Sequence, residues 1–159
     1  MHNSASAADE LVTDIQIDAS PDRVFEALVD PAQVPQWWGQ AGIYRCTAFE
    51  IDRRVGGTWQ CSGVGGDGSA FTISGKILEI DPPRVLAYTW KATWTGAFTT
   101  AVRWELTPAG GGTRVRVRHT GLAAKPELAQ SYRGWPRMLG WLQRFIQHGE
   151  TVGDRGTVG

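Results

Sequence analysis

The sequence predicts an α+β fold in which a curved, seven-stranded antiparallel sheet wraps around a long C-terminal helix. Apolar and polar residues alternate through most of the chain, which is typical of strands with one buried face. Closely spaced turn signals rich in glycine and proline separate these stretches, so successive strands are expected to form hairpins. A helical period of three and four residues dominates only the last part of the chain.

The first strand is expected over residues 11–19, and two short helices follow it. Ser20 can accept a hydrogen bond from an unpaired helix amide, and the proline after it suits the first position of a helix. Asp30 and Pro31 repeat this combination, which predicts a second short helix that ends near residues 37–38. The two short helices therefore lie between strands one and two.

The middle of the chain is predicted to contain the remaining six strands. They are expected at residues 45–52, 58–63, 69–80, 85–94, 98–107 and 113–120. Leu78 and Ile80 interrupt the alternation in one of them, which indicates a β-bulge. In the last strand, Arg114, Arg116 and Arg118 alternate with apolar residues, so the arginines are expected to face water.

The last helix is expected after Pro126 and is amphipathic. Its apolar residues recur at helical spacing and are Tyr132, Trp135, Leu139, Leu142, Phe145 and Ile146. Pro136 suits the first turn of this helix, and Gly149 marks its end. Because one face of the sheet is strongly aromatic, this helix is expected to cover it.

The chain has 159 residues, which predicts a single domain over residues 11–149 with flexible tails at residues 1–10 and 150–159. No apolar run could span a bilayer, and the start lacks the segments of a secretion signal, so we expect a cytoplasmic protein without membrane insertion. A formal net charge of zero argues against a nucleic-acid partner. Cys46 and Cys61 lie at no metal-ligand spacing, and neither a metal nor a cofactor is expected.

Large rings on the sheet and on the last helix are expected to hold the two layers apart and leave a ligand cavity. The ligand-binding residues expected there are Trp38, Phe71, Ile73, Tyr88, Trp90, Val102, Trp104, Val117, His119, Trp135, Leu139 and Leu142. The alternative interpretation is that these side chains fill a dry core. Trp37 and Trp38 could gate the cavity, recognise a partner or plug the edge of the core, and we favour plugging.

His119 is the only candidate catalytic residue in the sequence. The alternation places it on the inward face, where an imidazole could donate to a ligand or transfer a proton. The alternative is a histidine satisfied by backbone or water at the end of a strand. Glu50 and Glu79 lie near strand ends and are expected to be exposed. No nucleophile elbow, phosphate loop, zinc signature or dinucleotide fingerprint occurs.

A series of short motifs occurs in the order found in one known family. They include Ala19-Ser20-Pro21, Trp37-Trp38-Gly39, Val55-Gly56-Gly57-Thr58-Trp59, Asp81-Pro82-Pro83-Arg84, Tyr88-Thr89-Trp90, His119-Thr120-Gly121-Leu122 and Gly134-Trp135. Over residues 11–148 the chain resembles the activator of heat-shock-protein-90 ATPase homologues. This resemblance implies the START-like, birch-allergen-like (SRPBCC) superfamily and its helix-grip fold, which often leaves a hydrophobic tunnel beside the long helix.

Three functions are compatible with the sequence. The leading hypothesis is binding of a small apolar or aromatic, lipid-like ligand between sheet and helix, with His119 and the Tyr88 hydroxyl orienting it. The second is a cofactor-independent enzyme, acid/base or cyclase-like, that uses the same cavity with His119 as proton carrier. The third is an interaction module for a chaperone or regulatory protein. A homodimer is also left open.

Overall fold

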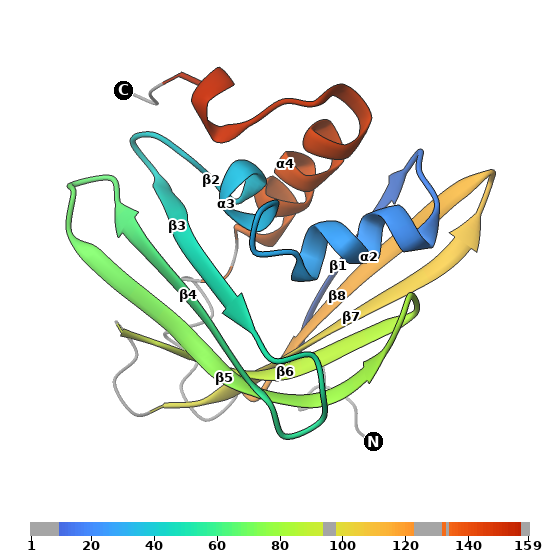
Figure 1. The fold of residues 1–159 in the computed structure, drawn as a ribbon, viewed down its shortest axis with the longest axis horizontal. Coiled ribbons are helices and arrows are strands. Elements are labelled where there is room, and N and C mark those ends of the chain that lie inside the picture. The colour runs from blue at the N-terminus through green and yellow to red at the C-terminus, as the bar shows by residue number, and fades with distance from the viewer. Residues whose placement is uncertain (1–9, 94–97, 123–131, 133, 157–159) are drawn as a thin grey trace.

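One curled antiparallel sheet of eight strands organises the fold, with the helices on its concave side (Figure 1). The computed structural model describes residues 10–93, 98–122, 132 and 134–156. The strands are β1 (Glu10–Ile17), β2 (Gly39–Gln40), β3 (Tyr44–Ile51), β4 (Thr58–Gly65), β5 (Ala70–Asp81), β6 (Val85–Ala92), β7 (Thr100–Ala109) and β8 (Gly112–Thr120). The helices are α2 (Pro21–Val29), α3 (Val34–Trp37), α4 (Trp135–His148) and the 3-10 turn η4 (Val152–Asp154).

The order across the sheet is β1-β8-β7-β6-β5-β4-β3-β2, and every neighbouring pair is antiparallel. Figure 1 shows β1, β8 and β7 rising on one side of the helices and β3, β4 and β5 rising on the other. The predicted α+β helix-grip fold is therefore confirmed. The long α4 lies in the concavity together with α2 and α3.

The sheet has one strand more than the seven that the sequence predicts. The additional strand, β2, comprises only two residues and pairs with the start of β3. Gly39 has a φ of 137°, and a Cβ at this position would lie 2.3 Å from the Cα of Arg45. Two residues are too few to show an alternation, so this strand left no pattern in the sequence.

A β-bulge interrupts the long β5, as predicted from Leu78 and Ile80. The register of β5 on β6 shifts between Ile77 and Glu79. A second bulge, between Cys46 and Ala48, was not predicted. Because a bulge bends its strand and increases the twist, these two irregularities help the sheet to curl around the helices.

The two short helices begin differently. Ser20 caps α2 as predicted, since its Oγ accepts a hydrogen bond from the backbone nitrogen of Arg23 over 3.2 Å. The second helix does not begin at Asp30, which is a correction. Asp30 is the C-cap of α2 and its carboxylate accepts from the backbone nitrogen of Ala32 over 2.9 Å, so it stabilises a turn, and α3 begins only at Val34.

Residues 150–156, which the sequence assigns to a flexible tail, pack against the body of the fold, and residues 157–159 of that expected tail lie outside the described residues. The packed segment carries a 3-10 turn with a capping box between Thr151 and Asp154. The side chain of Arg155 is 3% exposed and donates to backbone oxygens of α3, β2 and α4. The segment has few apolar residues, and a buried arginine holds it against the fold.

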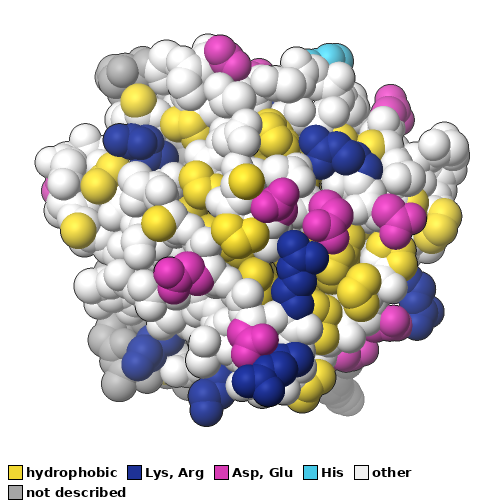
Figure 2. Space-filling view, in the orientation of Figure 1, with side chains coloured by type: hydrophobic (Ala, Val, Ile, Leu, Met, Phe, Trp, Pro, Cys, Tyr) yellow, Lys and Arg dark blue, Asp and Glu magenta, His cyan; other side chains and the backbone are white. Residues whose placement is uncertain are grey.

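The outer face of the sheet is stabilised by ion pairs. The predicted arginine stripe faces outward, where Arg116 contacts Asp14 over 3.0 Å and Arg118 contacts Glu105 over 3.1 Å. Each arginine of the stripe pairs with a carboxylate on a neighbouring strand. Figure 2 shows acidic and basic side chains interspersed on the face it presents.

In the described part of the chain, no helix is long and apolar enough to cross a membrane.

Candidate ligand-binding pocket

A pocket of about 600 Å³ lies between strands β3 to β6 and the N-terminal end of α4. We call it the aromatic pocket. Its lining residues are Trp38, Tyr44, Gly65, Ser69, Ala70, Phe71, Ile73, Trp90, Thr93, Tyr132, Gly134, Trp135, Arg137 and Met138. The wall is predominantly apolar, and Arg137 is the charged side chain among these residues. A cavity of this size and composition is typical of small-molecule sites.

The aromatic side chains of the pocket contact one another in a continuous series. The rings of Trp38 and Trp90 lie 6.0 Å apart, and those of Trp90 and Trp135 lie 5.6 Å apart. Two further lining rings, Tyr44 and Phe71, meet edge to face at 6.0 Å. Because each ring is fixed by its neighbours, the pocket wall is preorganised and does not have to be assembled by a ligand.

Local sequence explains how these rings reach the pocket. Trp38 is the C-cap of the short α3. Trp37, the last residue of that helix, points into the core, where its Nε1 donates to the backbone oxygen of Ala27 over 2.8 Å. Trp37 is therefore a core plug, whereas Trp38 stacks on it at 6.0 Å and lines the pocket. Trp90 comes from the inward face of β6, and Trp135 is the first residue of α4.

Two indole N–H groups in the pocket wall have no hydrogen-bond partner. Trp38 and Trp90 are 3% and 4% exposed, and neither Nε1 atom has an acceptor in hydrogen-bond geometry. Burial raises the pKa of Tyr44 and of Tyr132, and the neighbouring indole of Trp38 or Trp90, respectively, partly offsets that rise. A pocket tyrosine therefore lies beside each of these indoles, with its hydroxyl outside hydrogen-bond geometry to Nε1.

His119 lies behind the pocket wall and is completely buried. Its Nδ1 accepts from Nε1 of Trp135 over 3.1 Å, and its Nε2 lies 2.7 Å from Oγ1 of Thr100. Since Nδ1 accepts, the proton of the neutral ring is assigned to Nε2, which donates to Thr100. Burial lowers the pKa of His119 to about 4. Both ring nitrogens are therefore engaged by side chains, as in the alternative of a satisfied histidine.

Five of the predicted ligand-binding residues line the aromatic pocket, and seven do not. The five are Trp38, Phe71, Ile73, Trp90 and Trp135. The other seven, Tyr88, Val102, Trp104, Val117, His119, Leu139 and Leu142, are buried in the adjoining core. Nε1 of Trp104 donates to the Tyr88 hydroxyl over 2.9 Å, so this hydroxyl is already occupied by the protein. The dry-core interpretation thus describes most of the concave face, and the cavity interpretation describes the part around Trp38, Phe71 and Trp90.

Several lining residues were missed by the sequence analysis. Tyr44 and Thr93 lie at strand ends, Ser69 and Ala70 lie beside a hairpin turn, and Arg137 belongs to the polar residues of the last helix. Alternation gives no signal at the ends of strands, and a helical wheel does not indicate that a polar residue faces a cavity. Tyr132 and Met138 could have been expected to line the pocket, since both are large, mainly apolar residues near the start of the helix.

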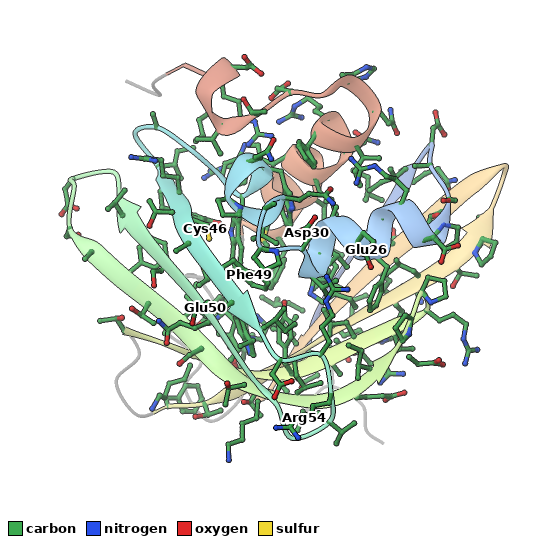
Figure 3. The ribbon with its side chains drawn as sticks, in the orientation of Figure 1. Glu26, Asp30, Cys46, Phe49, Glu50 and Arg54 are labelled. Atoms are coloured by element: carbon green, nitrogen blue, oxygen red, sulfur yellow. The ribbon has the colours of Figure 1, made fainter. Side chains whose placement is uncertain are left out.

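Glu50 and Glu79 lie away from the aromatic pocket. Glu79 is half exposed and pairs with Arg103 over 2.6 Å, and Glu50 is exposed on β3 (Figure 3). Glu50 lines a second, more polar hollow together with Lys76 and Lys91. Within the described residues, no group of three or more His, Cys, Asp or Glu side chains could hold a metal ion.

Comparison with known proteins identifies a family and several similar folds. The family described as activator of Hsp90 ATPase homolog 1-like protein matches residues 18–147. A solved protein from Nitrosomonas europaea superposes with a TM-score of 0.77 at 18% identity, over 90% of this chain and 97% of that one. CalU16 from Micromonospora echinospora gives a TM-score of 0.66 at 26% identity, over 88% and 77% of the two chains.

DynU16, a protein in the dynemicin biosynthetic locus, gives a TM-score of 0.68 at 25% identity. The match covers 91% of this chain and 49% of DynU16. A search of curated proteins found no match.

Proposed function

Because the chain belongs to the activator of Hsp90 ATPase homolog 1-like family, within the SRPBCC superfamily, we propose that it binds a small, largely apolar or aromatic molecule in the aromatic pocket. The observation that carries this proposal is the pocket of about 600 Å³ whose wall is a contiguous set of aromatic rings. A site of this kind can remove most of the surface of a small ligand from water.

The contrast between two parts of the concave face supports the assignment to this pocket. On the side of β1, β7 and β8 the space is filled by large side chains, such as Trp104, Leu139 and Leu142, each at most 1% exposed. Comparable rings line a pocket at one end of β3 to β6, whereas Trp59 and Tyr88, further along these strands, are buried in the core. A concave, largely apolar pocket is the usual form of a small-molecule site, which favours a binding role here.

The geometry gives less support to an acid/base enzyme. The hypothesis depends on His119, whose ring nitrogens are bonded to Trp135 and Thr100 and which does not line the pocket. A proton carrier must come within hydrogen-bond reach of its substrate, directly or through one water. The similarity to DynU16, a protein in the dynemicin biosynthetic locus, fits ligand binding as well as it fits catalysis.

The proposal is tested with the neutral fluorescent probe N-phenyl-1-naphthylamine. We expect saturable binding to the full chain, with enhanced emission as the probe leaves water. Ala70→Trp places a large ring at a lining position and should abolish this binding, while Leu78→Trp, on the exposed part of the same strand, should not change it. Absence of saturable binding by the folded wild-type protein, or equal binding by both variants, would overturn the proposal.

A further inference from the structure

We propose that the ligand of the aromatic pocket carries an oxyanion, a carboxylate or sulfonate, which Arg137 and the indole N–H groups of Trp38 and Trp90 bind. This inference rests on the proposed function and specifies the class of ligand. It predicts an amphipathic aromatic or aliphatic acid, with its apolar body against the rings and its acid group beside α4.

Arg137 supplies a positive charge that the described protein does not neutralise. Its neighbours in the C-terminal region, Arg144 and Arg155, both pair with Glu150. Arg137 makes no ion pair with any described carboxylate, yet it lines the pocket in the first turn of α4. The guanidinium also lies near enough to Tyr44 for its charge to lower the pKa of the tyrosine, against the larger effect of burial. The positive charge of Arg137 therefore acts on a group that lines the pocket.

The unpartnered indoles supply an independent observation. A buried N–H without an acceptor is destabilising, so such groups are uncommon in folded proteins. Three indole N–H groups lack an acceptor among the described residues; Trp141 lies outside the pocket lining, and those of Trp38 and Trp90 lie in the wall of one pocket. Both are donors and neither can accept. A ligand oxygen with lone pairs and negative charge would satisfy them, whereas a second donor would not.

The N-terminus of α4, like Arg137, favours a negatively charged group. The helix lacks a side-chain cap, and no acidic residue occurs in its first turn. Its free amides and dipole therefore favour negative charge next to Gly134 and Trp135, both of which line the pocket. The carboxylate of Asp67, in the turn beside Ser69, is already engaged by the backbone nitrogen and hydroxyl of that serine. The Arg137 cation, the dipole of α4 and the two indole N–H groups therefore all favour an anionic group on the ligand.

The test compares two probes that share an apolar frame. N-phenyl-1-naphthylamine is neutral, and 8-anilinonaphthalene-1-sulfonate adds a sulfonate. We expect the sulfonate probe to bind wild-type protein more tightly than the neutral one, and its affinity to fall as salt is raised, because salt screens an exposed cation. Arg137→Gln should weaken the sulfonate probe about tenfold and leave the neutral probe within about twofold. Arg137→Lys should restore most of the loss.

Two further variants make the result specific. Arg144→Gln removes a charge from the same helix outside the pocket and should change neither affinity. Trp38→Phe keeps a ring but removes one N–H, and it should weaken the sulfonate probe more than the neutral one. Equal sulfonate affinity in Arg137→Gln and wild type, with the neutral probe still bound, would overturn the oxyanion site and leave the proposed function standing. Failure of both probes to bind wild-type protein would overturn both.

Discussion

The indole nitrogen of Trp135 donates a hydrogen bond to Nδ1 of His119 over 3.1 Å, joining the first residue of α4 to the inward face of β8. The bond continues through the histidine to Thr100, whose Oγ1 lies 3.3 Å from the backbone oxygen of Trp90. Trp90 and Trp135 both line the aromatic pocket. The buried hydrogen bonds through His119 and Thr100 therefore hold these two wall residues in place. His119 is a positioning residue in this arrangement.

The first prediction concerns pH. Since burial lowers the pKa of His119 to about 4, the unfolded chain binds this proton near pH 6.5 and the folded chain does not. The resulting stability is complete above pH 6.5 and is lost as the pH falls toward 4. The free energy of unfolding in urea should therefore decrease by about 2 kcal/mol from this residue between pH 7.5 and pH 5.

In His119→Gln this component of the pH dependence should disappear, although the variant is less stable at pH 7.5. His148→Gln, which changes an exposed histidine at the end of α4, should retain the wild-type slope. A slope in His119→Gln equal to that of the wild type would show that His119 is not the group responsible.

Arg155 is predicted to contribute strongly to stability. Its guanidinium donates to the backbone oxygens of Trp37, Gly39 and Trp141 over 2.7, 2.6 and 3.1 Å. Arg155→Ala should leave these buried acceptors unpaired and reduce the free energy of unfolding by about 2–3 kcal/mol. Arg144→Ala, a half-exposed arginine that pairs with the same Glu150, should cost only about 0.5 kcal/mol. Urea denaturation measures both, and similar losses would contradict the prediction.

The two cysteines are predicted to be unreactive in the native protein. Cys46 on β3 (Figure 3) and Cys61 on β4 are 2% and 0% exposed, and their sulfurs lie 3.0 Å apart. The hydrogen bond to Cys46, together with burial, raises the pKa of the Cys61 thiol. Ellman's reagent at pH 8 should therefore label neither thiol within minutes and both in urea. A rapidly labelled native thiol would contradict this burial.

Gly75 is predicted to be irreplaceable in β5. A Cβ at this position would lie 1.9 Å from the backbone oxygen of Thr89, which also accepts from Nε1 of Trp59 over 2.9 Å. Gly75→Ala would force β5 and β6 apart and should cost about 2 kcal/mol or more. Gly153→Ala, with its nearest contact at 3.8 Å, should change stability by less than about 0.5 kcal/mol. Thermal unfolding of the Gly75→Ala and Gly153→Ala variants tests this prediction, and equal midpoint temperatures would refute the steric argument.

The sequence located most elements because their signals are local. The alternation through β7 and β8, the serine cap of α2 and the bulge beside Leu78 all depend on residues within a few positions of one another. Two elements, β2 and the C-terminal turn, depend on distant contacts that leave no local pattern in the sequence. β2 exists because Gly39 approaches Arg45, and the C-terminal turn is held by Arg155, whose acceptors lie on other elements.

The candidate site was predicted only in part, for a related reason. Alternation correctly assigned Trp90 and Trp104 to the inward face, and both are buried. It could not distinguish the ring that lines a pocket from the ring that bonds to Tyr88 in the core. That difference depends on which part of the sheet the helices cover.

By itself, the sequence determined the fold class, the inward face of each long strand and the aromatic character of that face, because these properties repeat along the chain with a fixed period. Only the tertiary structure decided that the concave face is filled around Trp59, Tyr88 and Trp104 and hollowed around Phe71 and Trp90, and that His119 supports the wall and does not face the pocket. Packing joins side chains from distant segments, and their fit is a property of the assembled layers that no local period encodes.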